Sequence, residues 1–320
     1  MQRMTRITLW RRAHLPAALV FVGLATGALE AGACELRLAG LANVTIAPGY
    51  NPFAAAGSSK AEGFEVVHLG EPCRFFVTFS VGAGSVGTGS AGTGGGGRRA
   101  LRGPAGGLGY EIHRSSRRAD ILAALPAARD RNLLSGVFAR GQAKRQLDYH
   151  LFVAPGQLVS PGRYQDAVRV AVYEGDLTTY RLADTRTVKV RTQVAAVVEV
   201  SLIDGGGRRD LAGARSVLDF GRLTTGKTKH FRIDVKTNSG YDIALESENR
   251  GVLRLADADL SSSVPYTLSL DGLALDLGSA VALPFSTARP SHRFAVTIGR
   301  IGNALSGRYQ DNILVTVTAR

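Results

Sequence analysis

A five-residue string that occurs twice constrains this chain more than any other feature. Gly-Arg-Tyr-Gln-Asp occupies residues 162–166 and again residues 307–311, an offset of 145 residues. Over residues 162–172 and 307–317, the two copies agree at seven of eleven positions. After each string, apolar residues occupy alternate positions, which is typical of a strand with one buried face. A repeat this long indicates two copies of one domain rather than a short-period solenoid.

The rest of the chain reads as many short strands separated by turns, without a long amphipathic helix. This pattern predicts an all-β protein built from two tandem sandwiches or barrels. We expect a first domain over residues 34–194 and a second over residues 195–320. Residues 186–194 form a spare alternating segment after the first copy of the repeated strand, whereas the second copy runs almost to the last residue. We therefore expect residues 186–194 to complete the first domain, and the second domain to lack an equivalent strand.

The N-terminal segment has the features of an export signal. Four arginines precede an apolar stretch at residues 15–28, and a small-x-small site ends at Ala33, which predicts removal of residues 1–33. The chain has only two cysteines, Cys34 and Cys73, which in an exported protein are most simply one disulfide. The alternative is a lipid anchor on Cys34, which Ala31 disfavours because lipidation signals usually carry a larger apolar residue there. After cleavage, no stretch is long and apolar enough to span a membrane.

Composition limits the classes of partner. The 45% apolar content is sufficient for a buried core, and the net charge of +13 favours anionic surfaces in general. No basic helix or aromatic-interleaved basic motif indicates nucleic-acid binding. Residues 81–109 are dominated by Gly, Ser, Ala and Thr, and they predict a mobile loop because such residues bury little apolar surface.

No motif in the sequence supports catalysis, a metal site or a cofactor. Residues 221–228 match a phosphate-loop pattern, but an alternating strand follows where such a loop requires a helix. The histidines are isolated, and no serine lies in a nucleophile elbow. Tyr164 and Tyr309 each stand at the start of a late strand, which predicts tyrosine corners whose hydroxyls bond to the local backbone.

Taken in order, these residues resemble the spore coat protein U domain family, the pilin-like subunits of archaic chaperone–usher systems. The resemblance rests on the two cysteines around an early strand pair, the aromatic stretch at residues 75–80, and the repeated string before an alternating strand. In the second copy it rests on residues 218–221, 238–245 and 307–317. The long glycine-rich segment and the absence of cysteines from the second copy depart from the family pattern.

The resemblance implies immunoglobulin-like sandwiches, the C-terminal one lacking its last strand. In such systems a periplasmic chaperone, and then a neighbouring pilin subunit, supplies that strand, and an outer-membrane usher secretes the subunits. We therefore expect an exported, non-enzymatic tip adhesin or minor pilin that reaches the cell surface and mediates attachment and biofilm formation, with an anionic or abiotic surface as a further partner. The alternative is a free-standing secreted or envelope binding protein with two complete sandwiches.

The second domain is expected to accept a strand but to donate none, since cleavage after Ala33 leaves no free N-terminal extension. The expected groove beside its last strand is lined by apolar residues from three strands: Phe231, Ile233, Val235, Phe294, Val296, Ile313, Val315 and Val317.

Overall fold

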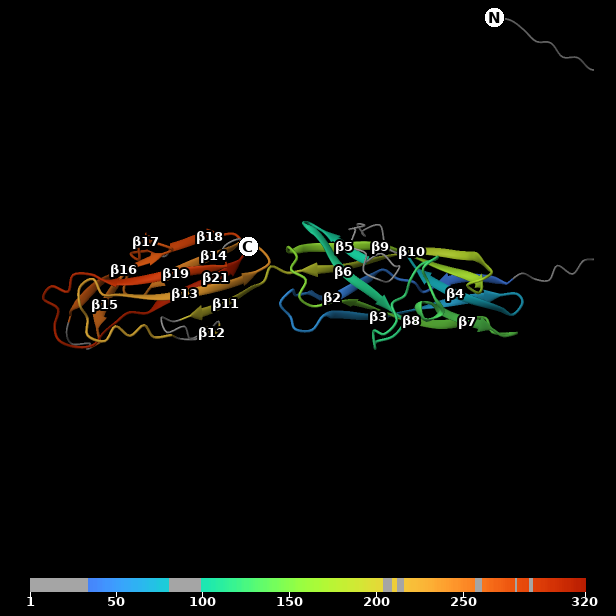
Figure 1. Ribbon diagram of the computed structural model, residues 1–320, viewed down its shortest axis with the longest axis horizontal. Helices are drawn as coiled ribbons and strands as arrows, with labels where there is room; N and C mark the ends of the chain where they lie inside the picture. Colours follow the sequence, from blue (N-terminus) through green and yellow to red (C-terminus); the bar gives the residue numbers. More distant parts are fainter. Residues whose placement is uncertain are drawn as a thin grey trace, which may run out of the picture.

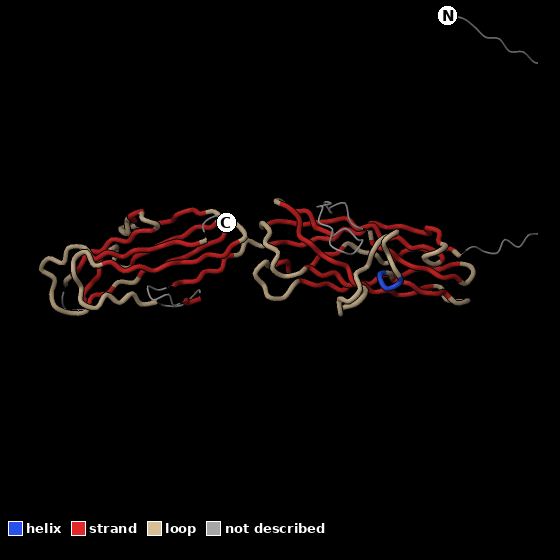
Figure 2. The backbone as a smooth tube through the Cα atoms, in the orientation of Figure 1, coloured by secondary structure: helices blue, strands red, loops and turns tan. Residues whose placement is uncertain are grey.

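The computed structural model describes residues 34–80, 99–203, 209–211, 216–256, 261–279, 281–287 and 290–320, with only the backbone described at residues 209–211. The predicted export signal and residues 81–98 lie outside this part. The described chain is all-β, and its one helical element is a 3₁₀ turn at Asp130–Asn132 (Figures 1 and 2). None of the described elements is a helix long and apolar enough to cross a membrane.

The N-terminal domain is a sandwich of two connected sheets. One sheet has the order β1-β3-β8-β6, and the other contains β7, β4, β9, β10 and β2; the hairpin of β5 and β6 joins them. Inward side chains of both sheets form one core. The strands are β1 (Glu35–Ala39), β2 (Val44–Tyr50), β3 (Ser58–Leu69), β4 (Cys73–Phe79), β5 (Arg99–Gly103), β6 (Gly106–His113), β7 (Leu134–Phe138), β8 (Lys144–Val153), β9 (Gly162–Gly175) and β10 (Tyr180–Val194).

The C-terminal domain is a second sandwich with its own core. One sheet has the order β12-β11-β13-β19-β16-β15-β20, with β17 beside β16, and the facing sheet has the order β18-β14-β21. The strands are β11 (Val198–Ile203), β12 (Arg209–Leu211), β13 (Thr228–Thr237), β14 (Tyr241–Ser247), β15 (Val252–Leu255), β16 (Ser263–Leu270), β17 (Leu273–Leu275), β18 (Val281–Phe285), β19 (Ser291–Ile298), β20 (Tyr309–Gln310) and β21 (Ile313–Ala319).

The two domains share one topology, as the repeated string predicts. Strands β1, β3, β4, β5, β6, β7, β8 and β9 correspond in chain order to β11, β13, β14, β15, β16, β18, β19 and the pair β20–β21. The pairings β1–β3, β3–β8, β6–β8 and β5–β6 recur as β11–β13, β13–β19, β16–β19 and β15–β16. The pairings β5–β9, β4–β7 and β4–β9 recur as β15–β20, β14–β18 and β14–β21. Strand β10 has no counterpart among the described strands.

Strand β10 closes the N-terminal domain, which confirms the prediction for residues 186–194. It runs antiparallel to β9 over most of its length and parallel to β2 at its end. Val188, Val190 and Val194 are at most 3% exposed, while the alternate residues Lys189, Arg191 and Gln193 are exposed. A strand that is paired on both edges and buried on one face belongs to the domain it closes.

The predicted loop at residues 81–109 is wrong over its last part. Residues 99–109 belong to the β5–β6 hairpin, in which Leu101 and Leu108 are fully buried. The buried Arg99 guanidinium donates hydrogen bonds to the carbonyl oxygens of Phe79 and Leu122, both at 2.7 Å. Two well-placed leucines and one buried arginine therefore order a segment whose average composition predicts a loop.

The Asn238 side chain forms hydrogen bonds across the junction between the domains. The Asn238 Nδ2 donates to the carbonyl oxygens of Ala195 at 2.9 Å and Val159 at 3.2 Å, and its Oδ1 accepts from the Val197 amide at 2.9 Å. These bonds connect the linker, the N-terminal domain and the C-terminal domain, which lie end to end (Figure 1).

Candidate strand-binding groove

Strand β21 is paired along one edge only. It forms an antiparallel ladder with β14 from Ser247↔Ile313 to Tyr241↔Ala319. Its counterpart β9 is paired along both edges, with β4 on one side and β10 on the other. Within the described part of the chain, no strand is hydrogen-bonded to the outer edge of β21. Among the described strands, the C-terminal sandwich therefore has no equivalent of β10, the last strand of the N-terminal sandwich.

The open edge changes the burial of equivalent side chains. Val168, Val170 and Val172 of β9 are 1%, 1% and 0% exposed. The corresponding residues of β21, which follow the repeated string at the same distances, are only partly buried although they contact the core. These are Ile313, Val315 and Val317. Because the sequences are closely similar here, the difference follows from the covering strand, which β9 has and β21 lacks.

Strand β11 lies on the open side of β21. It lies beside β21, but no ladder of backbone hydrogen bonds joins them. Val198, Val200 and Leu202 of β11 are partly buried and pack against the C-terminal core. The sequence alternation predicts a strand at this position but gives no sign that it faces β21. The predicted groove would thus be bordered by β11 and β21, which are the first and last long strands among those described in the domain.

Only part of the expected groove lining is exposed. Ile233, Val235, Phe294 and Val296 are 2%, 2%, 0% and 6% exposed, so they belong to the core rather than to an open groove. They lie on β13 and β19, which have neighbouring strands on both edges, so the sandwich covers their inward side chains. Phe231 is partly buried, with its ring stacked on that of Phe294 at a centroid distance of 4.7 Å.

The tyrosines of the repeated string bond to the backbone in the same way. The Tyr164 hydroxyl donates to the Ser160 carbonyl oxygen, and the Tyr309 hydroxyl donates to the Leu305 carbonyl oxygen, both at 2.8 Å. Each bond closes the loop just before the strand. A Cβ at Gly103 would overlap the ring of Tyr164, so a glycine is required where β5 crosses this corner.

The aspartates of the repeated string also have matching roles, which the sequence does not reveal. The Tyr110 hydroxyl donates to Asp166 at 2.8 Å, and the Tyr266 hydroxyl donates to Asp311 at 2.6 Å. Tyr110 and Tyr266 lie on the corresponding strands β6 and β16. Burial, together with the carboxylate beside each phenol, raises the pKa of both tyrosines far above the usual value, so the hydroxyls remain donors. The string is thus a structural element of the fold.

We expect the Tyr164→Phe substitution to lower the free energy of unfolding of the N-terminal domain by about 1 kcal/mol, the usual net value of one intramolecular hydrogen bond. The Tyr309→Phe substitution is the matched comparison. Its effect should be smaller, because Tyr309 is only partly buried and water can replace the lost bond. Urea unfolding of both variants measures this, and a larger loss for Tyr309→Phe would contradict the assigned roles.

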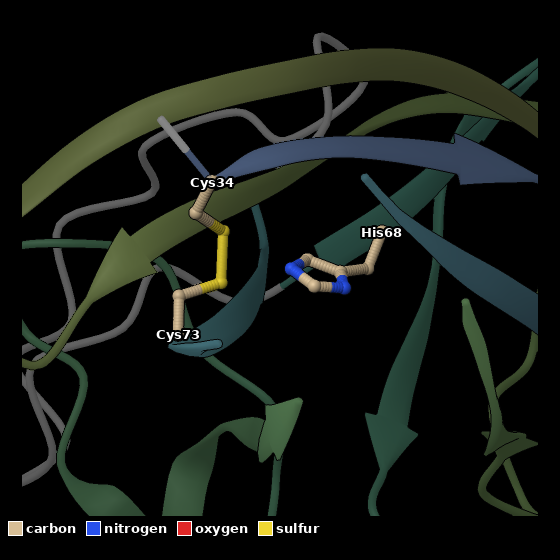
Figure 3. Close-up of side chains that lie close together, drawn as sticks. All are labelled: Cys34, His68 and Cys73. Carbon is tan, nitrogen blue, oxygen red and sulfur yellow. A yellow bond between two sulfur atoms is a disulfide. The ribbon is translucent and has the colours of Figure 1, made fainter. Parts of the chain in front are cut away.

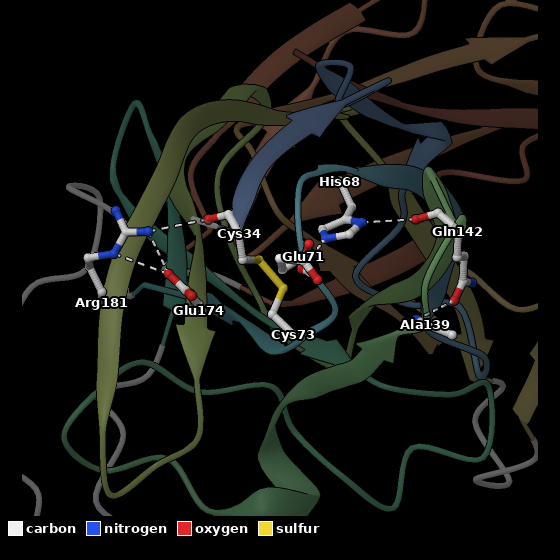
Figure 4. Close-up of a disulfide and its surroundings, with 8 residues drawn as sticks. All are labelled: Cys34, His68, Glu71, Cys73, Ala139, Gln142, Glu174 and Arg181. Atoms are coloured by element: carbon white, nitrogen blue, oxygen red, sulfur yellow. Dashed lines mark hydrogen bonds and ion pairs between the residues drawn. A yellow bond between two sulfur atoms is a disulfide. The ribbon is translucent and has the colours of Figure 1, made fainter. Parts of the chain in front are cut away.

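Cys34 and Cys73 form a disulfide, as predicted, and it joins the start of β1 to the start of β4 (Figure 3). A sulfur in a disulfide cannot carry a lipid. His68 lies beside the two sulfurs, but its ring nitrogens are 2.9 Å and 2.8 Å from the carbonyl oxygens of Gln142 and Glu71 (Figure 4). The two cysteines therefore offer no thiolate, and both ring nitrogens of His68 already lie within hydrogen-bond distance of backbone carbonyl oxygens. The cluster is a disulfide cross-link rather than a metal site.

The phosphate-loop pattern at residues 221–228 leads directly into β13, as predicted. The Lys227 ammonium donates to the carbonyl oxygens of Phe220 at 2.6 Å and Arg222 at 3.0 Å, which closes the turn. A phosphate loop uses the amides at a helix N-terminus, and this turn is followed by a strand instead.

No family model matches the chain, and no curated protein matches it either. Similar solved structures include the chaperone–tip subunit complex of the archaic chaperone–usher Csu pili of Acinetobacter baumannii, at 14% identity and a TM-score of 0.40 over 89% of this chain and 99% of that one. They also include CfaE, the adhesive subunit of the CFA/I fimbria of enterotoxigenic Escherichia coli, at 16% identity and a TM-score of 0.39, covering 88% of this chain and 93% of that one.

A third similar structure is the CupB6 tip adhesin of Pseudomonas aeruginosa, at 10% identity and a TM-score of 0.39, covering 90% of this chain and 95% of that one. All three are adhesive or tip subunits. Identities and TM-scores this low do not carry the role of those proteins over to this chain. Its role is therefore inferred from its own strand pairing and from the burial of its side chains.

Proposed function

We propose that this chain is a non-enzymatic subunit of a chaperone–usher pilus, a tip adhesin or minor pilin, whose C-terminal domain receives its last strand from a partner. The supporting observation is the open edge of β21 with its partly exposed Ile313, Val315 and Val317. An unpaired strand edge beside apolar side chains is a template for an incoming strand, and it favours aggregation when left uncovered. The strand would come from a periplasmic chaperone and later from a neighbouring pilin subunit.

The alternative of two complete sandwiches requires a strand beside β21. The N-terminal domain demonstrates how this chain builds such a strand, because β10 pairs with β9 residue by residue. No described strand has that position in the C-terminal domain. This contrast within one chain favours the incomplete subunit.

The proposal includes the organisation of the chain and its route. Residues 1–33 would direct export, residues 34–194 would form the adhesive domain, and residues 195–320 would form the domain that joins the fibre. The protein would pass through the periplasm and an outer-membrane usher to the cell surface. Cys34 is tied to Cys73 and begins a domain that its own β10 closes, so residues from Cys34 onward offer no free donor strand. This arrangement suits the end of a fibre.

A peptide copying residues 186–194 tests the proposal, because these residues close β9 and β21 carries nearly the same inward residues. Added to the mature chain at a hundredfold excess over its Kd, the peptide should raise the melting temperature of the C-terminal domain by roughly 10 °C. A control peptide with both central valines replaced by aspartate should have no effect. The proposal would be contradicted if the chain is monomeric, does not co-purify with a periplasmic chaperone, and shows no change in the melting temperature of its C-terminal domain with either peptide.

A further inference from the structure

The outer face of the β9–β10 ladder carries a row of basic side chains, which we call the basic face. It consists of Arg163 and Arg169 on β9 and Lys189 and Arg191 on β10, and all four are exposed. The alternate residues of the same two strands point inward and are buried, including Tyr164, Val168 and Val190. Strand alternation therefore places the four cations together on one side of the sheet.

The register of the ladder sets the spacing of these cations. Gln193 pairs with Arg163, Arg191 with Gln165, Lys189 with Ala167, and Thr187 with Arg169. Neighbouring strands lie about 4.8 Å apart, and alternate residues along a strand lie about 6.7 Å apart. The basic face is therefore a band two strands wide and roughly 20 Å long, with amide and hydroxyl side chains between the charges.

Acidic groups do not neutralise the basic face within the described part of the chain. The outward positions between its cations hold Gln165, Ala167, Thr187 and Gln193. Arg169 donates to the Thr185 hydroxyl at 3.0 Å, a neutral partner. Among the residues that the structure describes, the other three cations form no ion pair. The ion pairs of β10 lie further along the strand, where Arg181 meets Glu174 and Arg186 meets Asp184.

The repeat accounts for only one of the four cations, because Arg308 of the second string matches Arg163. In the C-terminal domain, the outward residues of β21 are Leu314, Thr316 and Thr318, and none is basic. The distal part of the same N-terminal sheet is covered on its outer side, where Ala128 and Leu133 pack against Phe76. The basic face is thus an open, charged region specific to one domain.

We propose that the basic face binds a linear acidic polysaccharide through carboxylate or sulfate groups. Guanidinium groups bind such anions by paired hydrogen bonds, and a flat band of regularly spaced cations matches a chain with charges at regular intervals. The interspersed Gln and Thr side chains can bond to sugar hydroxyls. Single-stranded nucleic acid fits less well, because its binding uses aromatic platforms and the basic face has none.

The acidic polysaccharide would be the ligand of the proposed adhesive subunit, so this proposal rests on the proposed function. Its test is independent, because the binding measurement involves the N-terminal domain while strand addition involves β21. A chain that binds polysaccharide but accepts no strand would refute the pilus role alone, and the reverse result would refute only the ligand.

Binding of the mature chain to heparin and to polygalacturonate tests the inference, with uncharged dextran as the negative probe. Both acidic polymers should bind, more weakly as salt rises. The Lys189→Gln/Arg191→Gln variant should lose about tenfold in affinity, since charge-assisted hydrogen bonds carry this free energy. Its melting temperature should be unchanged, because both side chains are exposed.

The matched control is Lys229→Gln/Arg254→Gln, which removes two exposed cations from the C-terminal domain. It should change the affinity less than twofold. Equal losses in the two double variants would show attraction to net charge alone and overturn the proposal. Equal binding of dextran, or tighter binding of single-stranded DNA with the same dependence on Lys189 and Arg191, would also overturn it.

Discussion

Changing Val188 and Val190 together to aspartate is expected to unfold the N-terminal domain at room temperature. Both side chains are buried in the core of that domain, at 3% and 1% exposure, on a strand paired along both edges. An unpaired carboxylate in such a position costs several kcal/mol, and two of them approach the whole stability of a typical domain, about 5–15 kcal/mol. Calorimetry of the mature chain should show the loss of one melting transition.

The control places the same new residues on the other face of β10. Thr187 and Gln193 are exposed, so Thr187→Asp/Gln193→Asp should leave both transitions within a few degrees of the parent chain. If Val188→Asp/Val190→Asp also leaves both melting transitions unchanged, residues 186–194 do not close the N-terminal domain. The comparison of β9, covered by β10, with the uncovered β21 would then have no basis.

Removing the disulfide is expected to have the second largest effect. The Cys34→Ala/Cys73→Ala variant should lower the free energy of unfolding of the N-terminal domain by about 4 kcal/mol, because the bridge closes a loop across a sequence separation of 39 residues. The C-terminal domain lacks cysteine and should melt as before.

Reductant provides the matching comparison for the disulfide. It should destabilise the parent chain by a similar amount and leave the double variant unaffected. Free thiols in material recovered from an oxidising compartment, or equal stability of the parent chain with and without reductant, would contradict the role of this bridge.

The sequence predicts the repeated architecture and the closing strand because both depend on local alternation. The string at residues 162–166 and its copy mark equivalent strands, and the valines of residues 186–194 alternate as a half-buried strand requires. The cysteine pairing follows from the count, since an exported chain with two cysteines has one intramolecular choice.

The groove is less predictable because exposure depends on neighbouring strands. Ile233 and Ile313 both lie on alternating strands, yet Ile233 is buried because β13 has strands on both edges, whereas β21 has one. The same holds for β11, whose place beside β21 is set by topology. The bonds from Tyr110 and Tyr266 to the aspartates of the string join residues 56 and 45 positions apart, beyond the reach of local patterns.

Amide hydrogen exchange of the mature chain tests the open edge of β21 most directly, with β9 as an internal reference. We expect fast exchange at the alternate amides of residues 313–319 that point away from β14, and protection of the equivalent amides of β9, which β10 covers. Adding the peptide of residues 186–194 should slow exchange in β21 and leave β9 unchanged. Protection of β21 equal to that of β9 before any peptide is added would show that its edge is already paired, and would contradict the incomplete C-terminal domain.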